Sequence, residues 1–330
     1  MINLKVAKVL MAFMVVFMFS NGVRAEEAQE GVKENDVPKH HFILIKPKLL
    51  VSFTDNRSVP GKTDGMYFRT DLDLLANYDY KKNKHEFLNE LEWKEGVSLS
   101  PMYDGFVISA DRFKFDTRYN FMFNKIGGYF VKAGFETHFL PGYDYQTEEV
   151  TYLIDGDRRV TANKYKLTSP GYPFYLHQAT GLLYRPVEKE TQSLEFTGGV
   201  AARQVFVKDS LKIVEDDSTP ERDLKTMTDI YEVGGEATVR FKGSMEDKKI
   251  EYDARLKAFM PFYTKDREEN GLSWGDVFQL EGSLKIDFNI NKYVAFNYEF
   301  NLKRDFAIVR DWQITNSLNL AIFYEFERRM

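Results

Sequence analysis

Five histidines are the side chains of this 330-residue sequence best suited to chemistry near neutral pH. His40 and His41 are adjacent and could supply two ligands to a metal, but a metal site needs further ligands that the neighbouring residues do not specify. A serine hydrolase needs a histidine beside a serine, together with a polar group that orients the histidine. His138 and His177 are the candidates for that role, and His177 has no matching serine partner. The sequence therefore predicts no metal, no cofactor and no catalytic residue.

Acidic and glycine pairs also occur, but their surroundings favour structural roles. Glu90 and Glu92 share one face of a strand, as many carboxylate pairs here do, so they do not mark a general acid and base. Gly198-Gly199 and Gly234-Gly235 lie inside strands with no helix after them, which indicates bends or bulges and not a phosphate cradle. The acidic run at 215–217 is expected to be a solvated loop and not a cation site.

The charged residues follow a two-residue period, which is clearest between residues 106 and 123. Aromatic residues such as Phe113 and Phe115 occupy odd positions there, and charged residues such as Lys114 and Asp116 occupy even positions. Successive side chains of a strand point to opposite faces, whereas a helix would mix the two kinds on every face. The segment therefore predicts a β-strand with one aromatic face and one charged face.

The same alternation recurs along the chain and predicts twelve strands. Two of the segments, 174–185 and 192–207, are less regular because Gly, Ala and Thr blur their two faces. The first segment contains Pro47, which removes a ladder hydrogen bond and makes its boundaries harder to place. The predicted strands span about 42–53, 66–80, 85–97, 106–123, 128–140, 174–185, 192–207, 229–242, 249–263, 276–288, 293–303 and 311–326.

The connections between these strands alternate in length. Short turns such as 81–84 and 289–292 separate longer connections such as 141–173 and 208–228. An even number of antiparallel strands with short periplasmic turns and longer outer loops is typical of a bacterial outer-membrane barrel. The strands are also long enough to cross a bilayer when tilted, whereas strands of a soluble sandwich average roughly five or six residues. We therefore expect an all-β, antiparallel, up-and-down transmembrane β-barrel.

Composition and the N-terminal segment fit export. Residues 1–25 combine two lysines, an apolar run and a small-x-Ala ending, which predicts a cleaved signal peptide. Residues 26–41 are predicted to be a flexible periplasmic lead-in, and residues 42–330 to be the barrel. Cleavage would leave 42 basic and 50 acidic residues, and this net negative charge argues against a nucleic-acid partner. The absence of cysteine excludes disulfides, thiol chemistry and a lipoprotein anchor.

Residues 42–326 resemble the uncharacterised Gram-negative outer-membrane β-barrel families, which are domains of unknown function. In strand number they are similar to the twelve-stranded nucleoside channels and to the outer-membrane phospholipase. The resemblance implies residence in the outer membrane, contact with its lipid and lipopolysaccharide, and insertion by the barrel-assembly machinery. The last strand resembles the terminal recognition strand of such barrels, although four residues follow Phe326 where the usual pattern ends on the aromatic residue.

The charged faces of the strands are expected to line the lumen. The function expected first from this arrangement is a narrow channel or passive transporter for small polar or charged solutes. The alternative is a closed structural or partner-binding barrel that acts through its extracellular loops. In the second case the charges form a salt-bridge lattice that fills the lumen. A lipid-directed hydrolase is a third alternative. The predicted lumen-lining residues are Arg69, Asp71, Asp73, Glu90, Glu92, Arg112, Lys114, Arg118, Glu136, Glu236, Arg240, Glu251, Asp253, Arg255, Lys257, Glu281, Lys285 and Glu299.

Overall fold

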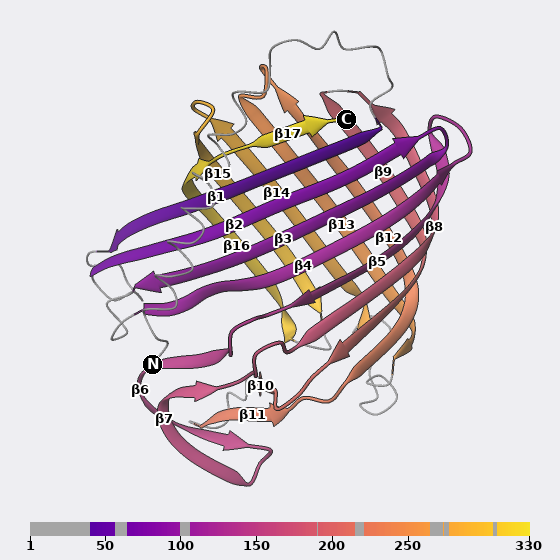
Figure 1. The fold of residues 1–330 in the computed structure, drawn as a ribbon. Coiled ribbons are helices and arrows are strands. Elements are labelled where there is room, and N and C mark those ends of the chain that lie inside the picture. The colour runs from indigo at the N-terminus through magenta and orange to yellow at the C-terminus, as the bar shows by residue number, and fades with distance from the viewer. Residues whose placement is uncertain are drawn as a thin grey trace. The chain divides into compact units, whose positions relative to one another are not determined.

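Twelve antiparallel strands of a single sheet close into a barrel in the computed structural model (Figure 1). The model describes residues 40–56, 65–99, 106–189, 191–214, 221–264, 273, 277–305 and 309–330. The barrel strands are β1 (His41–Asn56), β2 (Gly65–Lys82), β3 (His85–Leu99), β4 (Phe106–Met122), β5 (Gly127–Thr137), β8 (Phe174–Glu188), β9 (Gln192–Phe206), β12 (Ile230–Met245), β13 (Ile250–Thr264), β14 (Gln279–Asn289), β15 (Val294–Asp305) and β16 (Val309–Phe323). Each pairs with its neighbours in this order, and β16 pairs with β1. The predicted fold class and strand count are confirmed.

Some sequence-based boundaries fall outside the described residues or differ from the structure. Residues 1–39, which hold the predicted signal peptide and most of the predicted lead-in, are outside the described part, as is the acidic run at 215–217. His41, the last residue of the predicted lead-in, is already the first residue of β1. A search of the described residues for helices of transmembrane length and hydropathy finds none.

The predicted last strand, 311–326, is two strands in the structure. β16 ends at Phe323, and a short strand, β17 (Phe326–Arg329), continues along β1. The register pairs Lys48 with Phe323 and Ile45 with Phe326, so Pro47 lies opposite the break. Proline has no N–H to donate across the ladder, although its carbonyl oxygen accepts a hydrogen bond from the Tyr324 N–H at 3.2 Å. Pro47 therefore explains why the closing ladder is interrupted.

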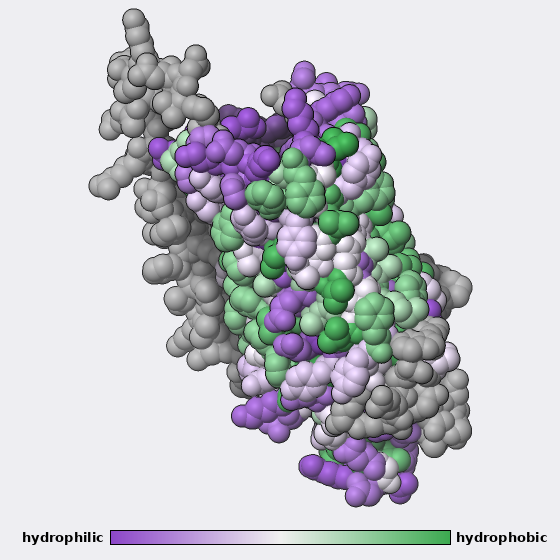
Figure 2. Space-filling view, turned by 90° about the vertical axis from the view of Figure 1, so that its right-hand side faces the viewer, coloured by the Kyte–Doolittle hydropathy of each residue, from purple (hydrophilic) through white to green (hydrophobic). Residues whose placement is uncertain are grey.

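The outer surface of the barrel is an apolar belt. Figure 2 shows hydrophobic residues over the middle of the wall and hydrophilic residues at both ends. Large apolar side chains there are exposed, including Leu182 at 64% and Leu318 at 63%. In water such an area would be unfavourable, but it matches the hydrocarbon of a bilayer, where strands must also close on themselves to satisfy their backbone. The alternation read from the sequence thus places its apolar face outward.

Lipid contact with this belt is testable because the chain has no native cysteine. We expect a fluorophore attached at Phe115→Cys or Leu256→Cys to be quenched by lipids with brominated acyl chains. Phe115 lies on the aromatic face of β4, and Leu256 is an exposed outer-wall residue of β13. A fluorophore at Ser283→Cys is the matched control, since Ser283 shares its strand face with Glu281, which pairs with Lys257. Equal quenching at the three positions would contradict the assignment of the faces.

The inner face is not uniformly polar, which differs from the sequence-based expectation. An apolar cluster of Met122, Phe130, Ala179, Leu183, Ala201 and Phe259 is buried there. Phe130 is 4% exposed between Tyr129 and Val131, which are exposed outward. A second cluster joins Leu50, Ala295, Ala321 and Phe323. These residues were missed because they lie on strands whose other inward residues are polar or small.

The two longest predicted loops are not irregular, but fold into a second sheet at one end of the barrel (Figure 1). Its strands are β6 (Tyr143–Ile154), β7 (Arg158–Lys166), β10 (Leu211–Val214) and β11 (Arg222–Thr226), in the order β10-β11-β6-β7. Tyr152, Ile154 and Leu224 form its buried core. We call these four strands the outer extension.

Candidate functional site in the lumen and at the outer rim

Charged side chains from distant strands meet inside the barrel. Glu90 on β3 lies 3.7 Å from Arg255 on β13 and 3.6 Å from Arg240 on β12. In the strand order of the ring, β13 is directly opposite β3. Arg240 also pairs with Asp253 at 2.5 Å. These side chains therefore bridge the full width of the lumen.

A second bridge lies near the short-turn end of the barrel, where one guanidinium joins three carboxylates. Arg185 on β8 donates to Glu86 on β3 at 3.1 Å, and to Glu188 and Glu195 at 3.0 Å each. Arg185 is 5% exposed. Arg118 on β4 donates a hydrogen bond to the other carboxylate oxygen of Glu195, at 2.6 Å. The cluster links β3 and β4 to β8 and β9 across the interior.

Two further groups of ion pairs join β1 and β3 to the last barrel strands. Lys46 contacts Glu251 at 2.8 Å and Glu325 at 3.0 Å. Lys94 lies 3.3 Å from Glu299 on β15 and 3.4 Å from Asp73 on β2. Lys48 pairs with Asp287 on β14 at 2.5 Å, so β1 is linked through the lumen to strands three and four places away.

The remaining predicted lumen residues lie in shorter-range pairs along the inner wall. Arg69 contacts Asp71, Arg112 contacts Glu92, Lys114 contacts Asp116, Lys257 contacts Glu281, and Glu236 contacts His177. Glu136 and Lys285 lie opposite Lys114 and Glu299 in their ladders. All eighteen predicted residues are thus beside an opposite charge or a polar partner on the inner wall.

Several of the most connected residues were absent from the sequence-based set, namely Lys46, Lys48, Glu86, Lys94, Arg185 and Glu195. Arg185 and Glu195 lie on β8 and β9, where glycine and alanine obscure the alternation. The parity of Lys46, Glu86 and Lys94 was visible in the sequence, but partners such as Glu251 for Lys46 and Glu299 for Lys94 lie 205 residues away. Nothing in a linear pattern identifies such a partner.

The histidines are distributed over separate places and do not meet. His40 lies 3.0 Å from the Lys81 carbonyl oxygen, His41 lies 3.0 Å from the Tyr78 hydroxyl, and His85 lies 2.6 Å from the Tyr119 hydroxyl. Within the described residues, no group of three His, Asp or Glu side chains is arranged to hold a metal ion. His177 lies 2.7 Å from Glu236, on the inner wall.

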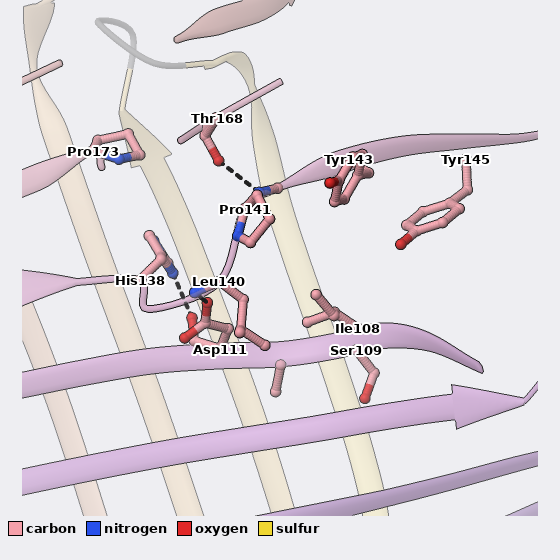
Figure 3. A pocket seen from close by; sticks show the side chains of 12 residues that line it. Ile108, Ser109, Asp111, His138, Leu140, Pro141, Tyr143, Tyr145, Thr168 and Pro173 are labelled. Carbon is pink, nitrogen blue, oxygen red and sulfur yellow. Dashed lines mark hydrogen bonds between the residues drawn. The ribbon is translucent and has the colours of Figure 1, made fainter. Parts of the chain in front are cut away.

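A pocket of about 290 Å³ lies at the outer rim, between the start of β4 and the start of β6 (Figure 3). The segment after β5 turns over β4 here, because the Asp111 carboxylate accepts the N–H groups of Phe139 at 3.0 Å and Leu140 at 2.6 Å. The Nδ1 atom of His138 donates to the Asp111 carbonyl oxygen. Tyr143 and Tyr145 form the opposite wall.

A buried polar cluster anchors the outer extension beside this pocket. The Asp144 carboxylate accepts the Tyr152 hydroxyl at 3.1 Å and lies 2.7 Å from the Arg222 side chain. Burial, followed by the nearby Asp144 charge, raises the pKa of Tyr152 to about 12. At the hairpin turn, hydrogen bonds from the Thr226 hydroxyl and N–H lower the pKa of Asp155. The extension is therefore an ordered unit with its own core and polar anchors.

Comparisons with known proteins find similar solved structures and one matching family. The translocator domain of the autotransporter NalP from Neisseria meningitidis is similar at 8% identity and a TM-score of 0.40, over 96% of this chain and 99% of that chain. The beta domain of a Bordetella autotransporter is similar at 13% identity and a TM-score of 0.35, over 87% of this chain and 100% of that chain. An outer membrane channel from Pseudomonas putida F1 is similar at 10% identity and a TM-score of 0.36, over 90% of this chain and 100% of that chain. A search among curated proteins finds no match. A family described as "Protein of unknown function (DUF3078)" matches residues 68–143, which run from β2 to the first residue of β6. The chain is thus a closed twelve-stranded β-barrel that resembles, over these residues, a family of unknown function.

Proposed function

We propose that this protein is a Gram-negative outer-membrane β-barrel whose lumen is closed by its own side chains, and that it acts by binding through the outer extension. The observation that carries the proposal is the contact of Glu90 with Arg240 and Arg255 across the ring. Those contacts occupy the centre of the lumen, where an aqueous channel would need free space. The proposal also places the apolar belt in contact with outer-membrane lipid and lipopolysaccharide, after insertion by the barrel-assembly machinery.

Burial of the inner face supports a closed lumen. Twelve strands lie between small barrels filled by side chains and large barrels with an aqueous channel, so strand number alone allows both. Phe130, Asn120 and Arg185 all point inward and are at most 5% exposed. Ion pairs at several places along the barrel also join strands that are three or four places apart in the ring and share no ladder. Such a lattice favours a stiff, filled barrel over a wide pore.

The outer extension supports a binding role. In outer-membrane barrels the longer connections face the exterior, and connections of this kind commonly carry function. Here they build a four-stranded sheet with a buried core around Tyr152, and Arg222 and Asp144 tie its strands together. An ordered surface binds with a smaller loss of conformational entropy than a disordered loop.

A narrow channel for small polar or charged solutes is the second candidate. It is favoured by the partial exposure of some inward charges, such as the side chains of Arg112 at 41% and Glu281 at 39%. Water therefore reaches part of the inner wall. The proposal includes no enzymatic activity, because His177 shares the inner wall with Glu236 and so faces away from lipid.

Planar bilayer recordings test the proposal. We expect the purified mature barrel to give no single-channel steps at either voltage polarity, because the ion pairs hold the lumen closed. A general porin inserted in the same membrane is the positive control for resolution. Steady, reproducible steps from the wild-type barrel would overturn the closed lumen and favour the channel.

A further inference from the structure

The pocket at the outer rim combines two kinds of wall (Figure 3). Its apolar side is made of the rings of Tyr143 and Tyr145, with Pro141 next to Tyr143. The two tyrosine ring centres are 5.9 Å apart and tilted by 53°. The tyrosines lie on β6 of the outer extension, Pro141 and Pro173 lie on the segments that join the extension to the barrel, and residues 108–111 belong to β4, so barrel and extension build the pocket together.

The other side of the pocket is polar and held in place. The Asp111 carboxylate accepts the N–H groups of Phe139 and Leu140 and shares a side-chain hydrogen bond with Glu95. A carboxylate has about four lone-pair positions, so one acceptor position is left for a ligand. Because the Nδ1 atom of His138 donates to a carbonyl oxygen, the neutral ring presents its Nε2 atom as an acceptor. The Thr168 hydroxyl oxygen accepts the Gly142 N–H at 2.9 Å, which leaves its own hydrogen to donate.

Charge in and around the pocket opposes strongly charged ligands. The Asp111 carboxylate disfavours an anion inside the pocket. The Lys164 ammonium group lies 4.1 Å from the centre of the Tyr143 ring and 5.0 Å from that of Tyr145, so one face of each ring already holds a cation and only the other face is left for a ligand. A second cation would be repelled by Lys164. The ligand that fits is neutral, with one apolar face and several hydroxyl groups.

We propose that this pocket binds a neutral saccharide. The C–H face of a sugar ring packs on the negative face of an aromatic ring, and its hydroxyl groups donate to carboxylate and imidazole acceptors. The volume of about 290 Å³ is at the lower end of the range for small-molecule sites, which suits one or two sugar units. The inference rests on the proposed binding role of the outer extension and names its ligand class.

Saturation-transfer NMR tests the proposal on the complete mature barrel in a sugar-free amine-oxide detergent. The probes are methyl glucoside, methyl galactoside, N-acetylglucosamine and the core oligosaccharide released from lipopolysaccharide. We expect saturation of the ring protons of at least one probe. Transfer to the core oligosaccharide alone identifies a membrane glycan as the source, whereas transfer to a simple glycoside identifies a free sugar. No transfer to any of the four probes would overturn the proposal.

Variants show whether sugar binding depends on this pocket or on tyrosines elsewhere on the barrel surface. The double variant Tyr143→Ala/Tyr145→Ala should weaken binding by about tenfold or more, because it removes two aromatic contacts. Tyr143→Phe/Tyr145→Phe keeps both rings and should retain most of the binding. Tyr231→Ala, an exposed tyrosine on β12 outside the pocket, is the matched control. Unchanged binding in the double alanine variant, or equal loss in Tyr231→Ala, would overturn the assignment to this pocket.

The same preparation distinguishes the two proposals. Sugar binding by a barrel that conducts ions would contradict the closed lumen and leave the pocket intact. A barrel that gives no single-channel steps and binds no sugar would contradict the proposed saccharide site but not the proposed closed lumen. Heat-dependent mobility on a gel verifies that each variant is folded. If the double alanine variant fails to fold, the single variant Tyr143→Ala tests the pocket, with Tyr143→Phe as its control.

Discussion

Replacing Arg185 with methionine is expected to lower the free energy of unfolding of the barrel by about 3–5 kcal/mol. The substitution keeps much of the side-chain volume but leaves the carboxylates of Glu86 and Glu195 without their shared cation. Arg185 is 5% exposed and Glu86 is 8% exposed, so water cannot replace the lost hydrogen bonds. Urea unfolding in lipid vesicles, followed by tryptophan fluorescence, measures the change.

Two variants show that this effect comes from buried charge. Arg329→Met removes an exposed arginine that contacts Glu327 at 3.3 Å, and should change the free energy of unfolding by less than about 1 kcal/mol. Adding Glu86→Gln to Arg185→Met should recover part of the lost free energy of unfolding, since one of the two buried carboxylates left without Arg185 is replaced by a neutral amide. If Arg185→Met unfolds like the wild type, the cluster does not stabilise the barrel.

Adjacent glycines on β9 are expected to respond in opposite directions. A Cβ atom at Gly199 would lie 2.0 Å from the Thr180 carbonyl oxygen and 2.6 Å from the Gly181 Cα atom, both backbone atoms of β8. Gly199→Ala should therefore force the paired strands apart and lower the free energy of unfolding by about 1–3 kcal/mol or more. At Gly198 the nearest atom to a Cβ is 4.0 Å away, so Gly198→Ala has room and should stabilise by about 0.5–1 kcal/mol.

The same unfolding experiment compares the two variants. Gly198→Ala is the matched control for Gly199→Ala, because both make the same chemical change in the same strand. The prediction is wrong if the two variants have the same stability, since the close approach of β8 and β9 would then not depend on glycine. The sequence-based interpretation of the two glycine pairs as bends or bulges holds at Gly234, where the register shifts, but Gly199 marks a close contact of strands.

The two stability predictions concern the same wall of the barrel. Arg185 and Gly199 lie on the paired strands β8 and β9, which carry residues of the inner charge cluster together with several glycines and alanines. Small residues let the strands approach, and the inward arginine and glutamate then reach across to β3 and β4. The irregular pattern that weakened the sequence prediction over these strands is thus the basis of their packing.

Local features of the chain were predictable from the sequence. Alternation between residues such as Phe115 and Lys114 reflects the two-residue repeat of a strand, which requires no knowledge of partners. Twelve repeats of it, with short and long connections in turn, determined the number, order and outward face of the barrel strands. The hairpin of the outer extension also has a local signal in the sequence, the pair Asp155-Gly156: both residues adopt positive φ, as tight turns between strands require.

Tertiary structure alone decided which side chains meet. Glu90 and Arg255 contact each other because closure of the ring places β3 opposite β13, and closure is a property of the whole sheet. The inward direction of Phe130, the folding of the long connections into the outer extension, and the pocket between Asp111 and Tyr143 depend on the same long-range geometry. A strand's own sequence specifies its two faces, but the distance across a closed barrel depends on all twelve strands at once.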